Sequence, residues 1–219
     1  MAEPLSGLKL YGLRSFSVKI GNEEAIQMDE AWREISRFSK KLHDKGYMAS
    51  HAGNLSIRRG YSMIIKRRGV AADEIGPEDV VEVSLDRIGE LDEFSSREAI
   101  VHRAIYMATS PSAVVHAHPP YSVACSILYD EIESADVEGK YTLQRIPVVV
   151  AEQATGSEEL AEKVSQVMQS SKGCVVRAHG TFAVGSVLEE AYRVTCAIES
   201  SCLIRYLLDL AEWQQKNKL

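Results

Sequence analysis

Hydrophobic residues follow two different spacings along this chain, and the two spacings alternate. Apolar side chains three to four positions apart form the buried face of a helix, whereas short alternating or continuous apolar runs are typical of strands. The helical spacing covers residues 26–45, 95–105, 121–129, 157–170 and 186–210. Strand-like runs cover residues 53–59, 61–66, 80–84, 114–118, 144–151, 173–180 and 181–184. This alternation, with a hairpin near the start, predicts a single α/β domain with a mixed β-sheet.

Several residue types predict where these elements begin and end. Gly46 follows the first helical stretch and is expected to end it. Ser95 or Ser96 is available as the N-cap of the second helix. Ser186 and Glu189 have the spacing of a capping box at the start of the last helix.

The segments outside these patterns define the extent of the domain. Residues 1–25 have no strong hydrophobic period, so we expect an extended N-terminal arm that packs on the body or on a neighbouring chain. Residues 26–219 then form one domain, a length that a single core can sustain. Within it, the acidic stretch 130–141 matches neither period and is assigned no element.

Two histidines at the end of an apolar run are the first candidates for chemistry. In the run that begins at Val114, His116 and His118 point to the same face of a strand, because successive side chains alternate. The proline pair after His118 ends the strand, so this histidine lies where loops and clefts occur. Two imidazoles on one face can bind one metal ion. The alternative is a pair of partly exposed histidines at a strand end.

A third histidine and one carboxylate complete a candidate metal centre. His179 lies near the end of the apolar run 173–180. Three neutral imidazoles with an open position or a displaceable carboxylate are typical of catalytic zinc, in contrast to cysteine-rich structural sites. Glu98, in the first turn of a predicted helix, is the candidate carboxylate, although helix capping explains it equally well. His102 lies one turn later on the same face and is more simply a packing or hydrogen-bonding residue than a fourth ligand.

Glycines and basic residues around the predicted hairpin indicate a site for a small anion. Gly53 and Gly69 would allow backbone amides to approach a ligand closely, with Asn54 and Arg68 as donors beside them. The alternative is that these are turn glycines flanking a solvated basic hairpin. A local basic cluster inside an acidic chain fits a small anionic ligand better than a polyanion, and its members are Arg58, Arg59, Lys66, Arg67 and Arg68.

Composition excludes several other classes of protein. The 219 residues carry a formal net charge of −6, which argues against a nucleic-acid partner. No apolar run is long enough to span a bilayer, and the N-terminus lacks a signal-peptide pattern, so we expect a cytoplasmic protein that does not bind membranes. The four cysteines have no Cys-x-x-Cys spacing, which favours reduced core thiols over disulfides or a zinc ribbon.

Four motifs in a fixed order resemble the class II aldolase/adducin family. They are Gly-Asn-Leu-Ser at residues 53–56, Ser-x-Glu-x-x-x-His at residues 96–102, Val-Val-His-Ala-His-Pro-Pro at residues 114–120, and His-Gly at residues 179–180 before a long final helix. The resemblance covers about residues 31–210. It implies a single domain with a central mixed, mainly antiparallel β-sheet flanked by helices.

The resemblance also implies roles for individual residues. His116, His118 and His179 would bind Zn²⁺, with Mn²⁺ or Co²⁺ as alternatives. Glu98 would be the acid/base carboxylate and would also ligate the metal when substrate is absent. The phosphate of a sugar phosphate would be held by residues that match or replace the family's phosphate loop and paired serines, namely Asn54, Arg68, Gly69, Ser95, Ser96 and Arg97.

The function that the resemblance implies is that of a zinc-dependent aldolase. Such an enzyme reversibly cleaves a ketose 1-phosphate into dihydroxyacetone phosphate and an aldehyde such as lactaldehyde, without a lysine Schiff base. The alternatives are a pentulose-phosphate 4-epimerase, a metal-dependent sugar-phosphate dehydratase, and a non-catalytic interaction module like the adducin head. Family members are cyclic homotetramers with the site between subunits, so we expect a homotetramer. A catalytic tyrosine of the family has no clear match, since Tyr129 falls too early and Tyr141 too late.

Overall fold

Strand β4 (Ala113–Ala117) lies inside an eight-stranded sheet in the computed structural model, which describes residues 22–217. The strand order is β3-β2-β1-β4-β8-β7-β6-β5, and only β6 and β7 pair in parallel. The other strands are β1 (Asn54–Arg59), β2 (Ser62–Lys66), β3 (Val80–Ser84), β5 (Glu131–Glu133), β6 (Arg145–Val149), β7 (Gly173–Val176) and β8 (Gly180–Gly185). The predicted mixed, mainly antiparallel sheet is confirmed.

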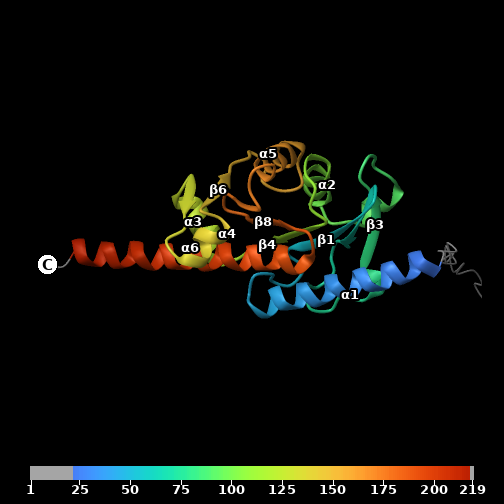
Figure 1. Ribbon diagram of the computed structural model, residues 1–219, viewed down its shortest axis with the longest axis horizontal. Coiled ribbons are helices and arrows are strands. Elements are labelled where there is room, and N and C mark those ends of the chain that lie inside the picture. Colours follow the sequence, from blue (N-terminus) through green and yellow to red (C-terminus); the bar gives the residue numbers. More distant parts are fainter. Residues whose placement is uncertain (1–21, 218–219) are drawn as a thin grey trace, which may run out of the picture.

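Helices cover both faces of this sheet (Figure 1). α1 (Asn22–Asp44) and α6 (Leu188–Lys216) lie along one face, whereas α2 and α5 pack together on the other. α3 and α4 pack against α6. The remaining helices are α2 (Ala99–Ala108), α3 (Pro120–Leu128), α4 (Val137–Thr142) and α5 (Glu158–Met168), with short 3₁₀ turns η1 (Pro77–Asp79) and η2 (Glu90–Phe94).

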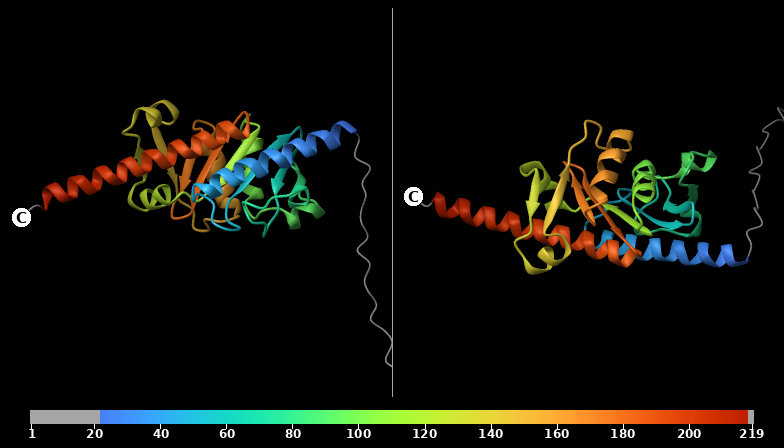
Figure 2. Two further views of the ribbon diagram at one scale, coloured as in Figure 1. Left: turned by 90° about the horizontal axis from the view of Figure 1, so that it is seen from below. Right: turned by 45° about the horizontal axis from the view of Figure 1, so that its top comes forward.

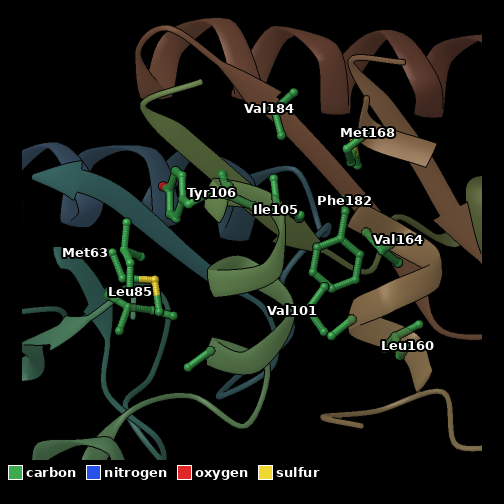
Figure 3. Packing of buried hydrophobic residues seen from close by; sticks show 14 of the residues in the cluster. Met63, Leu85, Val101, Ile105, Tyr106, Leu160, Val164, Met168, Phe182 and Val184 are labelled. Atoms are coloured by element: carbon green, nitrogen blue, oxygen red, sulfur yellow. The ribbon is translucent and has the colours of Figure 1, made fainter. Parts of the chain in front are cut away.

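Apolar side chains fill the space between the sheet and each helical layer. On one face, Phe182 of β8 packs in a cluster with Val101 of α2 and Val164 of α5 (Figure 3). On the opposite face, Ile35 and Phe38 of α1 are buried in a second cluster with residues of β1, β2 and β4. Because both faces of β4 are covered, all five of its residues are buried. This strand therefore gives a rigid support to any side chain at its end.

α6 extends beyond the sheet (Figure 2). Its N-terminal half is buried against β4 and β8. Its C-terminal part carries large apolar side chains that are exposed, namely Tyr206, Leu207, Leu208, Leu210 and Trp213. This apolar end of α6 is a surface that the described chain does not cover.

Several element boundaries differ from the prediction. The first helix begins at Asn22 and not at residue 26, and the rest of the arm predicted over residues 1–25 lies outside the described residues. The segment 130–141, which matched neither hydrophobic period, contains β5 and most of α4. α4 is short and begins where the Asp136 carboxylate accepts a hydrogen bond from the Gly139 amide, so capping defines it more than periodicity does.

The predicted capping box of the last helix is wrong. The N-cap of α6 is Val187, which has no side-chain capping bond. Ser186 instead donates from both its amide and its hydroxyl to the carboxylate of Glu190, each at 2.8 Å, and Glu189 takes no part. The same residue types thus stabilise the helix start in a register shifted by one residue.

The predicted N-cap of α2 is also wrong. The N-cap is Glu98 and not Ser95 or Ser96, and its carboxylate makes no capping bond. The Ser96 hydroxyl accepts from the Glu98 amide at 3.3 Å, so this serine stabilises the turn just before the helix.

Other predictions from composition can be compared directly with the structure. All four cysteines are free. Cys125, Cys174 and Cys202 are buried, which confirms the prediction of core thiols for these three, whereas Cys196 is only partly buried. Among residues 22–217, no helix is both long enough and apolar enough to cross a membrane.

Candidate active site

Three histidines converge at one end of the β4–β8 pair. His116 lies in β4, His118 follows its end, and His179 lies in the turn between β7 and β8 and not on a strand as predicted. Their potential ligand atoms lie within 4.8 Å of one another, and the Nε2 atoms of His116 and His118 are 2.9 Å apart. The structure therefore brings together the three imidazoles that were predicted from the sequence as metal ligands.

Pairing with β8 fixes the orientation of His116. This residue is opposite Phe182 in the antiparallel register, and the two rings stack with centroids 4.3 Å apart. Nδ1 of His116 lies 2.9 Å from the carbonyl oxygen of Thr181, which can only accept a hydrogen bond. The proton must therefore be on Nδ1, and the lone pair of Nε2 is directed toward the other histidines.

Gly180 allows β8 to approach His118 closely. A Cβ atom at this position would lie 2.3 Å from the carbonyl oxygen of Ala117 and 2.7 Å from Cδ2 of His118. The backbone of His118 is also held, because its amide donates to the carbonyl oxygen of Tyr47 at 2.7 Å. The glycine that follows His179 is thus required by packing against His118, which gives the His-Gly motif a physical reason.

The turn that carries His179 is held by α3. Ala178 has a φ of 58°, a left-handed conformation that costs a non-glycine residue roughly 1 kcal/mol. The Ser126 hydroxyl accepts from the Ala178 amide at 3.0 Å, and the Ser126 carbonyl accepts from Nε of Arg177 at 2.9 Å. These bonds offset the strain and fix the direction in which His179 leaves the sheet.

Burial keeps the three imidazoles neutral. It lowers the pKa of His116 well below 6.5, with smaller contributions from His118 and His179. Burial, with a further contribution from His179, lowers the pKa of His118 to about 4, and burial also lowers the pKa of His179. Nδ1 of His179 is buried, and the Ala154 backbone opposes the lowering of the His179 pKa. Neutral imidazoles with converging lone pairs fit a divalent metal ion, because binding then requires no proton release.

Glu98 lies on the wall of the same cavity, but its carboxylate is outside the group of ligand atoms that the three histidines form in the described chain. Glu98 is 4% exposed, and its Oε1 accepts from the Gly156 amide at 3.1 Å. Oε2 is buried without a hydrogen-bond partner in this part of the chain. Burial raises the pKa of Glu98 to about 7, against the opposing effect of the Gly156 amide. A carboxyl group with this pKa can both donate and accept a proton near neutral pH.

Five of the six predicted phosphate residues line this cavity, whose volume is about 170 Å³, and they are Asn54, Arg68, Gly69, Ser96 and Arg97. Gly69 has a φ of 77°, so its backbone conformation favours glycine. Oδ1 of Asn54 is buried without a hydrogen-bond partner in residues 22–217. The structure does not bring Ser95 to the cavity, since the Ser95 hydroxyl donates to the carbonyl oxygen of Asp92 at 2.8 Å.

Arg68 and Arg97 lie where this cavity meets a larger one of about 650 Å³. Both residues are exposed, and within residues 22–217 neither guanidinium has a hydrogen bond or an ion pair. Arg58, in contrast, donates to the carbonyl oxygens of Tyr106 and Thr109, away from the cavity. The predicted basic cluster is therefore divided between the two ends of the hairpin. Of its members, only Lys66, Arg67 and Arg68 line the cavity that contains the histidines.

Sequence reasoning missed the structural role of Lys66. The residue is 1% exposed, and its ammonium group donates to the carbonyl oxygens of Val70 at 2.5 Å and His51 at 3.4 Å. Burial lowers the pKa of Lys66 to about 8, while the charge of Asp79 opposes this. Lys66 thus ties together two loops that line the cavity. The sequence did contain a signal for the burial of Lys66, because this residue ends the apolar run 62–66.

Thr155 and Gly156 were also missed. Thr155 lines the cavity, and Gly156 donates the hydrogen bond to Glu98. Gly156 has a φ of 56°, and a Cβ atom there would lie 2.9 Å from the carbonyl oxygen of Arg97. No local pattern could have revealed this contact, because Gly156 lies 58 residues from Glu98 along the chain.

His102 is a buried hydrogen-bonding residue, as predicted. Its Nδ1 is 2.7 Å from Oγ of Ser56, which is also 2.8 Å from the hydroxyl of Tyr106. Burial lowers the pKa of His102 to about 3, so the ring is neutral. Because Ser56 belongs to the Gly-Asn-Leu-Ser segment, this bond joins the strand that carries Asn54 to the helix that begins beside Glu98.

The sequence matches the family described as Class II Aldolase and Adducin N-terminal domain over residues 33–206. The chain therefore belongs to this family, as its four motifs predicted.

Individual relatives include proteins named as sugar-phosphate aldolases. An L-fuculose phosphate aldolase of Methanococcus maripaludis strain C7 is 31% identical over 170 residues, which are 77% of this chain and 92% of that protein. A 5-methylthioribulose-1-phosphate/5-deoxyribulose-1-phosphate aldolase of Escherichia coli O45:K1 is 29% identical over 76% of this chain and 78% of that protein. The crystal structure of L-fuculose-1-phosphate aldolase from Thermus thermophilus has a TM-score of 0.78 and 32% identity, covering 86% of this chain and 97% of that one.

The contact between Gly180 and β4 leads to a prediction about stability. Gly180→Ala should lower the free energy of unfolding by roughly 1–3 kcal/mol, because the added methyl group must displace backbone. Urea denaturation measures the change. Gly89→Ala is the control, since a Cβ atom there meets nothing within 4 Å, and it should change stability by less than about 0.5 kcal/mol. Equal stability of the two variants would contradict the packing argument.

Proposed function

We propose that this chain is a zinc-dependent class II aldolase that reversibly cleaves a ketose 1-phosphate into dihydroxyacetone phosphate and an aldehyde such as lactaldehyde. The observation that carries the proposal is one cavity lined by three neutral histidines, a buried carboxyl group and two unpaired arginines within the described chain. Membership of the family and similarity to sugar-phosphate aldolases support it. A non-catalytic module like the adducin head would have no need of such a group.

His116, His118 and His179 would hold the metal ion, which is Zn²⁺ or, as alternatives, Mn²⁺ or Co²⁺. When bound, the ion supplies Lewis-acid chemistry that polarises a carbonyl oxygen and stabilises developing negative charge. The histidines bind it without losing protons because burial keeps them neutral. The Thr181 carbonyl fixes the tautomer of His116.

Glu98 would move the proton at the reacting carbon. In cleavage it would donate a proton to the carbon from which the aldehyde departs, and in synthesis it would remove that proton. The Gly156 amide holds Oε1, while Oε2 has no partner among residues 22–217 and is available to substrate. A pKa of about 7 makes both directions accessible near neutral pH.

Asn54, Gly69 and Ser96 would bind the phosphate, with Arg68 and Arg97 supplying positive charge. A guanidinium can make two charge-assisted hydrogen bonds to a phosphate, which an uncharged hydroxyl cannot. The absence of internal partners for both arginines within the described chain supports this role.

We also propose that the chain forms a homotetramer with its sites at subunit interfaces. Two observations support this assembly. The exposed apolar end of α6 offers a surface for a neighbouring subunit. In addition, no tyrosine of residues 22–217 lines the cavity, which leaves room for a neighbouring subunit to supply a proton donor of that type.

The retained alternatives differ in their products. A pentulose-phosphate 4-epimerase would use the same carbon–carbon cleavage without releasing the fragments, and a dehydratase would release water. The E. coli relative is named for 5-methylthioribulose 1-phosphate, which supports a ketose 1-phosphate with a different aldehyde half as a second candidate substrate.

Metal removal and product analysis test the function together. Purified protein should hold about one metal ion per chain and release dihydroxyacetone phosphate from L-fuculose 1-phosphate or 5-methylthioribulose 1-phosphate. Chelation should abolish release, and added Zn²⁺ should restore it. His116→Ala should lose the metal, whereas His43→Ala, outside the cavity, should keep it. Full metal content in His116→Ala, or substrate conversion without dihydroxyacetone phosphate, would contradict the proposal.

Glu98→Gln should separate catalysis from metal binding. The amide has nearly the same shape but cannot carry the proton, so we expect turnover to fall by roughly 10²-fold or more. Metal content, measured by elemental analysis, should stay close to that of the parent protein. Glu162→Gln, a substitution on α5 outside the cavity, is the control and should leave turnover unchanged. Unchanged turnover in Glu98→Gln would require another group as the base.

Replacement of the two arginines tests the phosphate site. Arg68→Ala and Arg97→Ala should each lower kcat/KM for a ketose 1-phosphate by up to about 10- to 100-fold, the effect of losing charge-assisted hydrogen bonds, and the double variant by more. Cleavage of the unphosphorylated ketose should barely change. Arg87→Ala, an exposed arginine outside the cavity, is the control. Equal losses with and without the phosphate in every variant would exclude an anion pocket.

A further inference from the structure

The position of His118 depends on contacts made by the backbone around it. It lies beyond the end of β4, so no sheet pairing holds it. Nδ1 of His116 is oriented by a carbonyl oxygen, whereas the ring of His118 in the described chain contacts the other two histidines and has no hydrogen bond to a backbone carbonyl. The position of His118 must therefore be set by its own backbone amide, which donates to the Tyr47 carbonyl, and by the segment that follows it.

Glu199 of α6 holds the segment that follows His118, at the start of α3. It is 3% exposed, and its carboxylate accepts three hydrogen bonds from the first turn of α3. Oε1 accepts from the Tyr121 amide at 2.9 Å, while Oε2 accepts from the Ser122 amide at 2.7 Å and from the Ser122 hydroxyl at 2.6 Å. The N-cap residue of α3, Pro119, makes no capping bond of its own. A buried carboxylate from another helix thus performs the capping.

The link between this capped turn and His118 is short and stiff. Only Pro119 and Pro120 separate His118 from Tyr121, and the pyrrolidine ring of each proline fixes φ. Pro119 has a φ of −66°. A movement of the first turn of α3 would therefore be transmitted to His118, and its distance from His179 would change.

We propose that Glu199 is a positioning residue for the metal centre, which fixes His118 by anchoring the first turn of α3. This inference rests on the proposed function, because it requires that the three histidines bind a metal ion. Glu199 touches neither the ligand atoms nor the cavity. Glu199 would instead fix the arrangement of the three histidine ligand atoms around the ion.

Metal titration tests this role independently of activity. Metal-free Glu199→Gln should bind Co²⁺ about tenfold or more weakly than the parent protein, the scale seen when support of a metal ligand is lost. The visible absorption spectrum of its Co²⁺ form should also change, because that spectrum reports ligand geometry. Ser122→Ala removes one of the three hydrogen bonds and should show a smaller change in the same direction.

A matched control separates positioning from general stability. Asp136 accepts from the Gly139 amide at the start of α4 and from the Ser201 hydroxyl of α6, an arrangement similar to that of Glu199 but without a link to a histidine. Asp136→Ala should lower Tm and leave Co²⁺ affinity and spectrum unchanged.

Three outcomes of the titration are distinguishable. If the parent protein binds no Co²⁺, the proposed function fails, and with it the premise of this inference. If the parent binds Co²⁺ and both Glu199→Gln and Ser122→Ala match its affinity and spectrum, only the positioning role is overturned. Equal weakening by Asp136→Ala would likewise overturn it. Because Ser122→Ala is a mild change, it gives an answer even if the Glu199 variant does not fold.

Discussion

The close antiparallel pairing of β4 and β8 is the interaction on which the candidate site depends. It places His116 opposite Phe182 and brings the turn that carries His179 beside the end of β4. The pairing is so close at Gly180 that no side chain fits there. Helical layers bury both faces of β4, so the strand cannot move without disrupting two clusters of apolar side chains. The convergence of the histidines is therefore a consequence of packing in the core.

Burial then determines the chemistry of the groups that the sheet brings together. The same loss of solvent lowers the pKa of His118 to about 4 and raises that of Glu98 to about 7. The imidazoles are consequently neutral, and the carboxyl group is near the midpoint of its titration at neutral pH. Arg68 and Arg97 differ, because they are exposed and without partners in residues 22–217. One cavity thus has a buried side with the histidines and Glu98 and an open side with two arginines.

The sequence allowed the sheet class and the three histidines to be predicted because both leave local patterns. Apolar runs that end in a histidine are visible within a few residues, and so is the His-Gly pair. The contacts that support these histidines leave no such pattern. Gly156 and Glu98 are 58 residues apart, and Glu199 and Ser122 are 77 apart, so only the fold shows that they meet. The serine caps predicted for α2 and α6 were wrong for a different reason, since neighbouring polar residues compete for the same backbone groups and spacing does not decide among them.

We propose above all that His116, His118 and His179 hold one divalent metal ion. X-ray diffraction from crystals of the zinc-loaded protein, with data collected on both sides of the zinc absorption edge, tests it most directly. We expect one anomalous peak per chain, about 2.0–2.1 Å from a ring nitrogen of each of the three histidines. The absence of a peak at this position, or a zinc ion bound by other residues, would contradict it.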